Sequence, residues 1–163
     1  MLVAFVESIK YVGHLLPIAF LRIFLGYFYF NQGLGLMRGP RDLLSQATLA
    51  EDIRNYLARN PAPEWYKYAL ETIVIPNWHI FSVVLIGLQI AIGVSYIIGY
   101  FVRPFAIVAI LLCFAMLFAT GPGPSEAQAM FLLVLHFTLG WMGAGRCLGI
   151  DYYFYKRRRG VWW

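Results

Sequence analysis

Long apolar segments constrain this chain more than any motif does. A helix that crosses a bilayer needs about 20 mainly apolar residues. The segments that meet this length are Pro17–Met37, Trp78–Tyr100, Pro104–Thr120 and Ser125–Gly145. Apolar residues make up 61% of the sequence and charged residues 13%, against roughly 45–50% and about 25% in soluble domains. The sequence therefore predicts an all-α membrane protein, a bundle of four transmembrane helices forming one domain over residues 1–163.

The basic residues predict the orientation. An even number of spans places both termini on one side, together with Lys10, Arg103, Arg146 and the run Lys156, Arg157, Arg158 and Arg159. Because cytoplasmic flanks carry the excess of Lys and Arg, we expect cytoplasmic termini in an inner membrane of bacterial or archaeal type. The basic tail, residues 151–163, would contact lipid headgroups. Residues 1–13 would lie along the interface as a short amphipathic helix. This placement of charge argues for lipid and against nucleic acid as a partner.

The first loop, residues 38–77, is too long to be only a connector. "TLAE" at 48–51 has the pattern of a capping box at the start of a helix. An apolar face at helical spacing follows, made of Leu49, Ile53, Tyr56 and Leu57. Further on, Trp65 suits a membrane–water boundary. We expect an extracytoplasmic amphipathic helix; it would rest on the bilayer, act as a lid, or dock a partner.

Several polar residues lie inside the predicted spans. Arg22 and Tyr29 share one face of the first helix with glycines that allow close helix packing. Arg22 would either point inward, within reach of Gln89 on the second helix, or extend to lipid headgroups. His136 lies near the middle of the fourth helix, and intramembrane ionisable residues merit a functional hypothesis. A hydrogen bond from His136 to a backbone carbonyl is the structural alternative. Glu126 begins the fourth helix near the opposite membrane face.

The cofactor remains open. The histidines lie at depths that differ by about 10 Å or more, which disfavours a haem held by two of them. A pigment that needs only His136, or a quinone, fits the sequence without any further motif. Cys113 and Cys147 form no CxxC pair, so two buried and inert thiols are expected. No metal site is predicted.

Three stretches together resemble the DoxX family of membrane proteins. "LRIFLGYFYFNQGLGLM" resembles its first helix, including the early arginine. "YALETIVIPNWHIFSVVLIGLQIAIGVSYIIGYFVRPFAI" is similar to its run of loop, second helix, G-x-x-x-R turn and third helix. "GAGRCLGIDYYF" at 143–154 resembles its closing G-x-G-R…L-G-x-D pattern. The order and spacing of these pieces cover about residues 15–155.

The resemblance implies a four-helix membrane bundle, with some members serving as subunits of thiosulfate:quinone oxidoreductases. Where many relatives carry a glutamate in the second helix, this chain has Gln89. An amide accepts no proton in turnover and carries no charge to balance Arg22. We therefore expect a structural role for Arg22 and no catalytic residue in the chain.

Two functions follow as hypotheses. The first is an accessory or structural subunit of a larger membrane electron-transfer or energy-converting complex, which packs against other subunits. The second is the quinone-facing membrane subunit of a thiosulfate:quinone-type oxidoreductase. A pigment- or lipid-binding subunit is a further alternative. A small multidrug-type exporter is disfavoured, because such an exporter needs a carboxylate within its first helix and this chain has none there.

Overall fold

The computed structural model describes residues 10–38, 42–44, 48–59, 62–119 and 124–157. Within these ranges the regular structure is helical throughout, and no strand is present. The long helices are α2 (Leu16–Arg38), α5 (Trp78–Ile98), α6 (Val102–Ala119) and α7 (Pro124–Met142). The prediction of an all-α protein is confirmed.

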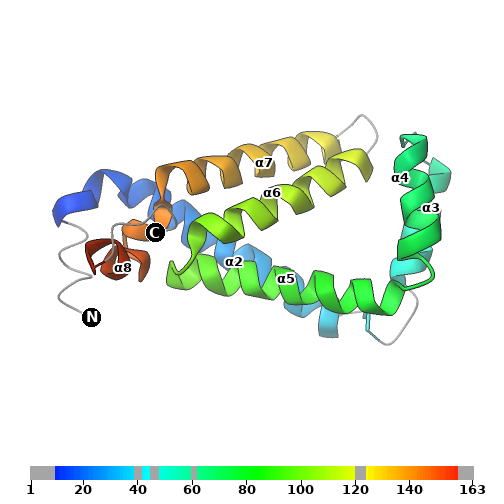
Figure 1. Cartoon of the computed structure of the whole chain (residues 1–163), viewed down its shortest axis with the longest axis horizontal. Coiled ribbons are helices and arrows are strands. Elements are labelled where there is room, and N and C mark those ends of the chain that lie inside the picture. Colours follow the sequence, from blue (N-terminus) through cyan, green and yellow to red (C-terminus); the bar gives the residue numbers. More distant parts are fainter. Residues whose placement is uncertain (1–9, 39–41, 45–47, 60–61, 120–123, 158–163) are drawn as a thin grey trace.

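The four long helices run along the long axis of the molecule in alternating directions (Figure 1). α2 packs most extensively against α5, and α6 against α7. The bundle therefore consists of two antiparallel helix pairs. The start of α2, the end of α5, the start of α6 and the end of α7 gather beside α8 (Asp151–Arg157). We call this the α8 end, and the opposite one, beside α3 (Thr48–Arg59), the α3 end.

Two glycines end helices earlier than the apolar pattern predicted. Gly99 and Gly143 have φ values of +71° and +63°, a left-handed conformation that stops an α-helix. As a result α5 ends at Ile98 rather than at Tyr100, and α7 ends at Met142. The predicted extension of the fourth helix to 145 was wrong, because the chain turns there into the short 3₁₀ helix η3 (Ala144–Arg146).

The segment between α2 and α5 contains more helix than the sequence indicated. α3 is followed by α4 (Glu64–Ala69) and by a π-helical turn, η2 (Leu70–Val74). The Tyr66 hydroxyl donates to the Ala115 carbonyl at 2.9 Å. This hydrogen bond attaches α4 to the last part of α6.

The predicted capping box at the start of α3 stays a prediction, although both of its residues, Thr48 and Glu51, are described and lie in the first turn of that helix. Within the described part, the Thr48 hydroxyl donates to the Asp42 carbonyl at 3.2 Å. The predicted interfacial helix over residues 1–13 is described only from Lys10, where the chain is already helical and leads through η1 (Gly13–Leu15) into α2.

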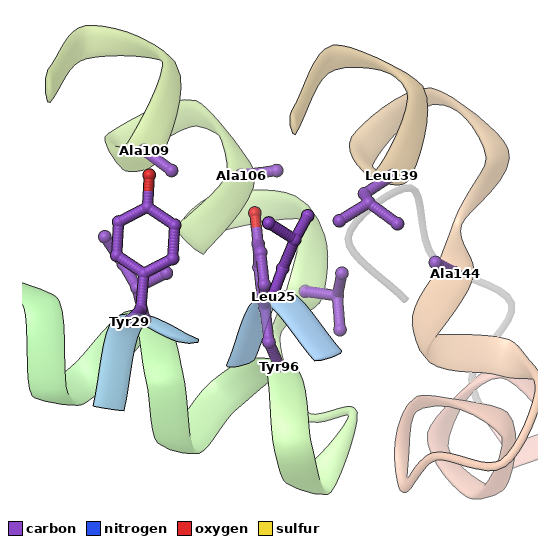
Figure 2. Packing of buried hydrophobic residues seen from close by; sticks show 9 residues of the cluster. Leu25, Tyr29, Tyr96, Ala106, Ala109, Leu139 and Ala144 are labelled. Atoms are coloured by element: carbon purple, nitrogen blue, oxygen red, sulfur yellow. The ribbon is translucent and has the colours of Figure 1, made fainter. Parts of the chain in front are cut away.

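The core lies between the two helix pairs. Leu25 and Tyr29 from α2 and Ile92 and Tyr96 from α5 pack against α6 and α7. Figure 2 shows the rings of Tyr29 and Tyr96 directed from α2 and α5 toward α6, where the small side chains are. Because alanines of α6 face these rings, two large aromatic groups fit between the pairs without separating them.

The outward faces of the long helices are apolar. Exposed side chains include Phe24 (64%), Leu111 (63%) and Phe131 (63%). In the described chain, Lys10–Arg38 and Trp78–Ile98 are long and apolar enough to cross a membrane by length and composition, and the apolar helix Val102–Phe118 is shorter. Large apolar side chains that point outward from a bundle are more stable in contact with lipid than in contact with water.

Candidate functional site

The Arg22 side chain is completely buried at the α8 end and donates three hydrogen bonds to backbone carbonyls, while its Nε has no hydrogen-bond partner among the described residues. Its Nη1 donates to Ala144 O at 2.7 Å and to Cys147 O at 3.2 Å, and its Nη2 donates to Leu148 O at 2.9 Å. All three acceptors belong to the irregular segment that follows α7. Arg22 is 0% exposed, so it points inward and does not extend to headgroups. The guanidinium therefore ties the first long helix to the last part of the chain.

The predicted partner of Arg22 was wrong. Gln89 lies opposite Gly33, whose Cβ position is 3.4 Å from the Gln89 Cβ, whereas Arg22 lies opposite Gly99. Because α2 and α5 are antiparallel, Arg22 and Gln89 are separated by about 15 Å along the helices at 1.5 Å per residue. The oxygen Oε1 of Gln89 is buried without a hydrogen-bond partner among the described residues.

Glycines leave the space that Arg22 and its acceptors occupy. A Cβ on Gly149 would collide with the carbonyl of Gly145 and would lie 2.8 Å from Arg22 Nη1. A Cβ on Gly145 would collide with the carboxylate of Asp151. These positions explain the glycines of the "GAGRCLGID" motif, because the backbone there must approach a guanidinium and a carboxylate closely.

Asp151 caps the start of α6. Its Oδ1 accepts from the Phe101 amide at 2.8 Å and its Oδ2 from the Val102 amide at 3.2 Å. Burial raises the pKa of Asp151 above its ordinary value, while the two amides and the nearby Arg22 and Arg103 act in the opposite direction. The carboxylate thus joins α8 to the α5–α6 turn.

Two non-glycine residues at this end have positive φ: Phe101 at +55° and Leu148 at +51°. Such backbone is costly and persists where surrounding contacts hold it. The Phe101 amide is held by Asp151, and the Leu148 carbonyl accepts from Arg22. The strained backbone therefore coincides with the contacts of the buried charges.

A second polar cluster lies between the two helix pairs. His136 is 0% exposed, and its Nε2 lies 2.8 Å from the Tyr29 hydroxyl while its Nδ1 lies 2.9 Å from the Tyr96 hydroxyl. The Tyr29 oxygen is 4.0 Å from Cys113 Sγ. The imidazole thus bonds to side chains from the other helix pair, rather than to a backbone carbonyl.

One arrangement of protons satisfies every N–H and O–H donor in this cluster, and leaves only the weak S–H donor of Cys113 outside these bonds. Tyr96 donates to Nδ1, Nε2–H donates to the Tyr29 oxygen, and the Tyr29 hydroxyl donates to Cys113 Sγ. In the reverse arrangement the Tyr96 proton has no acceptor among the contacts above. Since a buried donor without an acceptor is costly, the geometry favours a neutral His136 protonated at Nε2.

The cluster fits poorly with a pigment held by His136. Metal ligation needs a ring nitrogen with a free lone pair, and both nitrogens already face tyrosine hydroxyls. A ligated pigment would have to displace Tyr29 or Tyr96 from the core. His136 therefore connects the two helix pairs through its hydrogen bonds to Tyr29 and Tyr96.

Two further polar residues, the candidate Glu126 and the buried Ser82, lie toward the α3 end. Glu126 is in the first turn of α7, about 27 Å along the bundle from the segment that binds Arg22, so it is not the partner of that arginine. Ser82 on α5 is fully buried, and its hydroxyl has no hydrogen-bond partner among the described residues.

The proposed docking face on the first loop is half-buried in this chain. Its α3 residues Leu49, Ile53, Tyr56 and Leu57 are each partly covered. Trp65 on α4 is 61% exposed, with its ring 5.3 Å from that of Phe118. The assignment of this face to a partner stays a prediction.

The predicted basic tail begins as part of the fold. Asp151 and Tyr152 are buried in α8, while Lys156 and Arg157 are exposed. Arg158 and Arg159 lie outside the described residues. Sequence reasoning thus missed Asp151 as an anchoring group, although its position in the closing motif was the available signal.

These features define a helical membrane protein whose interior polar groups join its helices to one another. A family described as "DoxD: TQO small subunit DoxD" matches residues 18–162. The chain belongs to the DoxD family, which confirms the predicted DoxX/DoxD-like assignment. No curated protein and no solved structure matches the chain.

Proposed function

We propose that this chain is an accessory membrane subunit of a quinone-linked oxidoreductase of the thiosulfate:quinone type. The observation that carries the proposal is the family match over residues 18–162, since that family is described as the small subunit of TQO. A small subunit acts within a complex, so other protein subunits are its expected partners. The chain is proposed to form one DoxX-like domain over residues 1–163.

The accessory role rests on how the interior polar groups are used. Arg22 donates to three carbonyls of its own chain, and both nitrogens of His136 bond to tyrosines. Gln89 replaces the acid of many relatives and offers no titratable group. Groups bound in this way hold helices together, and we therefore assign the redox step to a partner subunit.

The proposed placement is an inner membrane crossed by α2, α5, α6 and α7. The α8 end carries the basic residues Lys10, Lys156 and Arg157 and would face the cytoplasm. The α3 end would face outward, where α3 and α4 would rest on the bilayer and dock an extracytoplasmic partner.

Isolation of the complex tests this function. The chain, tagged in its native membrane, is extracted in mild detergent, separated on a blue-native gel and analysed by mass spectrometry. We expect a band far larger than the 18.7 kDa chain, containing a subunit that oxidises thiosulfate. A lone chain that itself reduces quinone with thiosulfate would contradict the accessory role and support the quinone-facing alternative.

That alternative has one observation in its favour. A cleft of about 820 Å³ opens at the α8 end beside Trp141 and Tyr155, and it is large enough for a quinone ring. Solvent extraction of the purified complex and of the purified chain would distinguish the two cases. Quinone retained by the chain alone supports a quinone-facing subunit.

A further inference from the structure

The outward face of α2 carries an amide at mid-bundle depth. Phe30 packs against Gly93, and Gly33 packs against Ile90. Asn31 therefore lies level with the middle part of α5. It is exposed, and its side chain makes no hydrogen bond to any other residue that the structure describes. In a lone copy this amide would face lipid acyl chains, where a polar group without a partner is costly.

The other long helices carry no exposed amide at this depth. Their large outward side chains there are apolar, as at Val84 on α5, Leu111 on α6 and Phe131 on α7. The exposed amide of α7, Gln128, lies in the second turn of that helix and so near a membrane surface. Among the described residues, α2 is thus the long helix whose lipid-facing side is polar in its middle.

Asn31 belongs to a seam with heptad spacing. Phe24, Phe28, Asn31 and Gly35 follow one another at intervals of four, three and four residues, the spacing at which a helix faces a parallel partner. All four are exposed. A Cβ on Gly35 would meet nothing within 4 Å, so packing inside this chain does not require a glycine there. A glycine on the outside of a membrane helix lets a second backbone approach closely.

The occupant that suits this seam is a second copy of the chain. Two copies with the same topology in one membrane are related by an axis along the membrane normal, so each residue lies at the same depth as its counterpart. An asparagine amide both donates and accepts. Two Asn31 side chains can therefore satisfy one another across a two-fold axis. Lipid offers no such partner, and a different subunit would need its own amide at this depth.

We propose that α2 pairs in parallel with α2 of a second copy of this chain, on a two-fold axis that passes near Asn31. The amides of the two copies bond to each other, and Gly35 allows the backbones to approach one turn closer to the α3 end. The proposal requires α2 to cross the membrane, but it does not involve the redox partner. It can therefore fail while the proposed function holds, and the reverse.

Energy transfer between copies tests the pairing. The purified full chain is labelled at Lys156→Cys, since the native cysteines are buried. Donor-labelled and acceptor-labelled copies are reconstituted together in phosphatidylcholine vesicles at decreasing protein-to-lipid ratios. We expect transfer above the level of random proximity and linear in the acceptor fraction, as for a dimer. Asn31→Leu should need about tenfold more protein per lipid for half-maximal transfer. Asn31→Gln keeps an amide and should recover part of this loss.

Matched controls separate the seam from the rest of the surface. Gly35→Ile should weaken association, because a branched side chain keeps the two backbones apart. Gly87→Ile places the same side chain on the outside of α5, where a Cβ likewise meets nothing within 4 Å, and should associate as the unaltered chain does. Gln128→Leu removes an exposed amide away from the seam and should also have no effect.

Disulfide crosslinking in native membranes locates the contact. On oxidation, Phe24→Cys and Phe28→Cys should each give a species of twice the chain's mass. Phe131→Cys is the control, because Phe131 on α7 is 63% exposed, against 64% for Phe24, and it should stay monomeric. Transfer at the level of random proximity, unchanged association of Asn31→Leu, or crosslinking through Phe131→Cys alone would overturn the proposal. The seam would then be left to lipid or to a different subunit.

Discussion

The guanidinium of Arg22 donates to the carbonyl of Ala144 at 2.7 Å across 122 residues of sequence. This bond joins α2, the first long helix, to the segment that follows the last one. Two further carbonyls of the same segment accept from Arg22. Arg22, although it lies in an apolar helix, therefore connects parts of the chain that are distant in sequence.

Replacing Arg22 with leucine should destabilise the protein by about 3 kcal/mol, because three buried carbonyls lose their donor. Arg22→Lys should recover only part of this loss, since one ammonium does not reproduce the planar fork of a guanidinium. Thermal unfolding in detergent, followed by circular dichroism or light scattering, measures the difference. Wild-type melting of Arg22→Leu would show that these bonds contribute nothing to stability.

Substitution of Gly145 by alanine should destabilise the α8 end, because the added Cβ collides with the Asp151 carboxylate. The bonds from Asp151 to the Phe101 and Val102 amides would then be lost or lengthened. The matched control is Gly87→Ala on α5, where a Cβ meets nothing within 4 Å. Melting temperatures should fall for the first variant and stay equal or rise slightly for the second. Equal changes in both would refute the steric explanation.

Removal of either tyrosine hydroxyl next to His136 should weaken the contact between the helix pairs. Tyr29→Phe and Tyr96→Phe should each cost about 1–2 kcal/mol, the range of interhelical polar contacts in membranes. Tyr27→Phe is the control, since Tyr27 is on the same helix and is 62% exposed. Nitrogen NMR of labelled histidine should show the neutral form protonated at Nε2. A form protonated at Nδ1 would reverse the assignment of donors.

The proposed orientation is tested by labelling single introduced cysteines with a reagent that does not cross membranes. Arg54→Cys on α3 should react from outside, and Lys156→Cys on α8 should react only after the membrane is opened. Both positions are exposed, whereas the native Cys113 and Cys147 are buried and should give little background. Labelling in the reverse order would contradict cytoplasmic termini.

The sequence by itself was sufficient for the helical class, the family and the positions of the long helices. An apolar run long enough to span a membrane marks a segment that forms a helix surrounded by lipid. For this reason α2 and α6 begin within two residues of their predicted starts. The ends of the helices were predicted less accurately than their starts. At Gly99 and Gly143 the backbone conformation, rather than the apolar pattern, stops the helix.

The partners of the buried polar groups were decided only by the tertiary structure. Sequence spacing places Arg22 and Gln89 on helices that pack together, but it does not give the register of the pair. In the fold, Arg22 lies opposite Gly99, and its acceptors are carbonyls made available where the chain leaves helical geometry after α7. Backbone carbonyls carry no signature in the sequence, because every residue has one. Only the path of the chain determines which of them lack a helical partner and can bind a buried arginine.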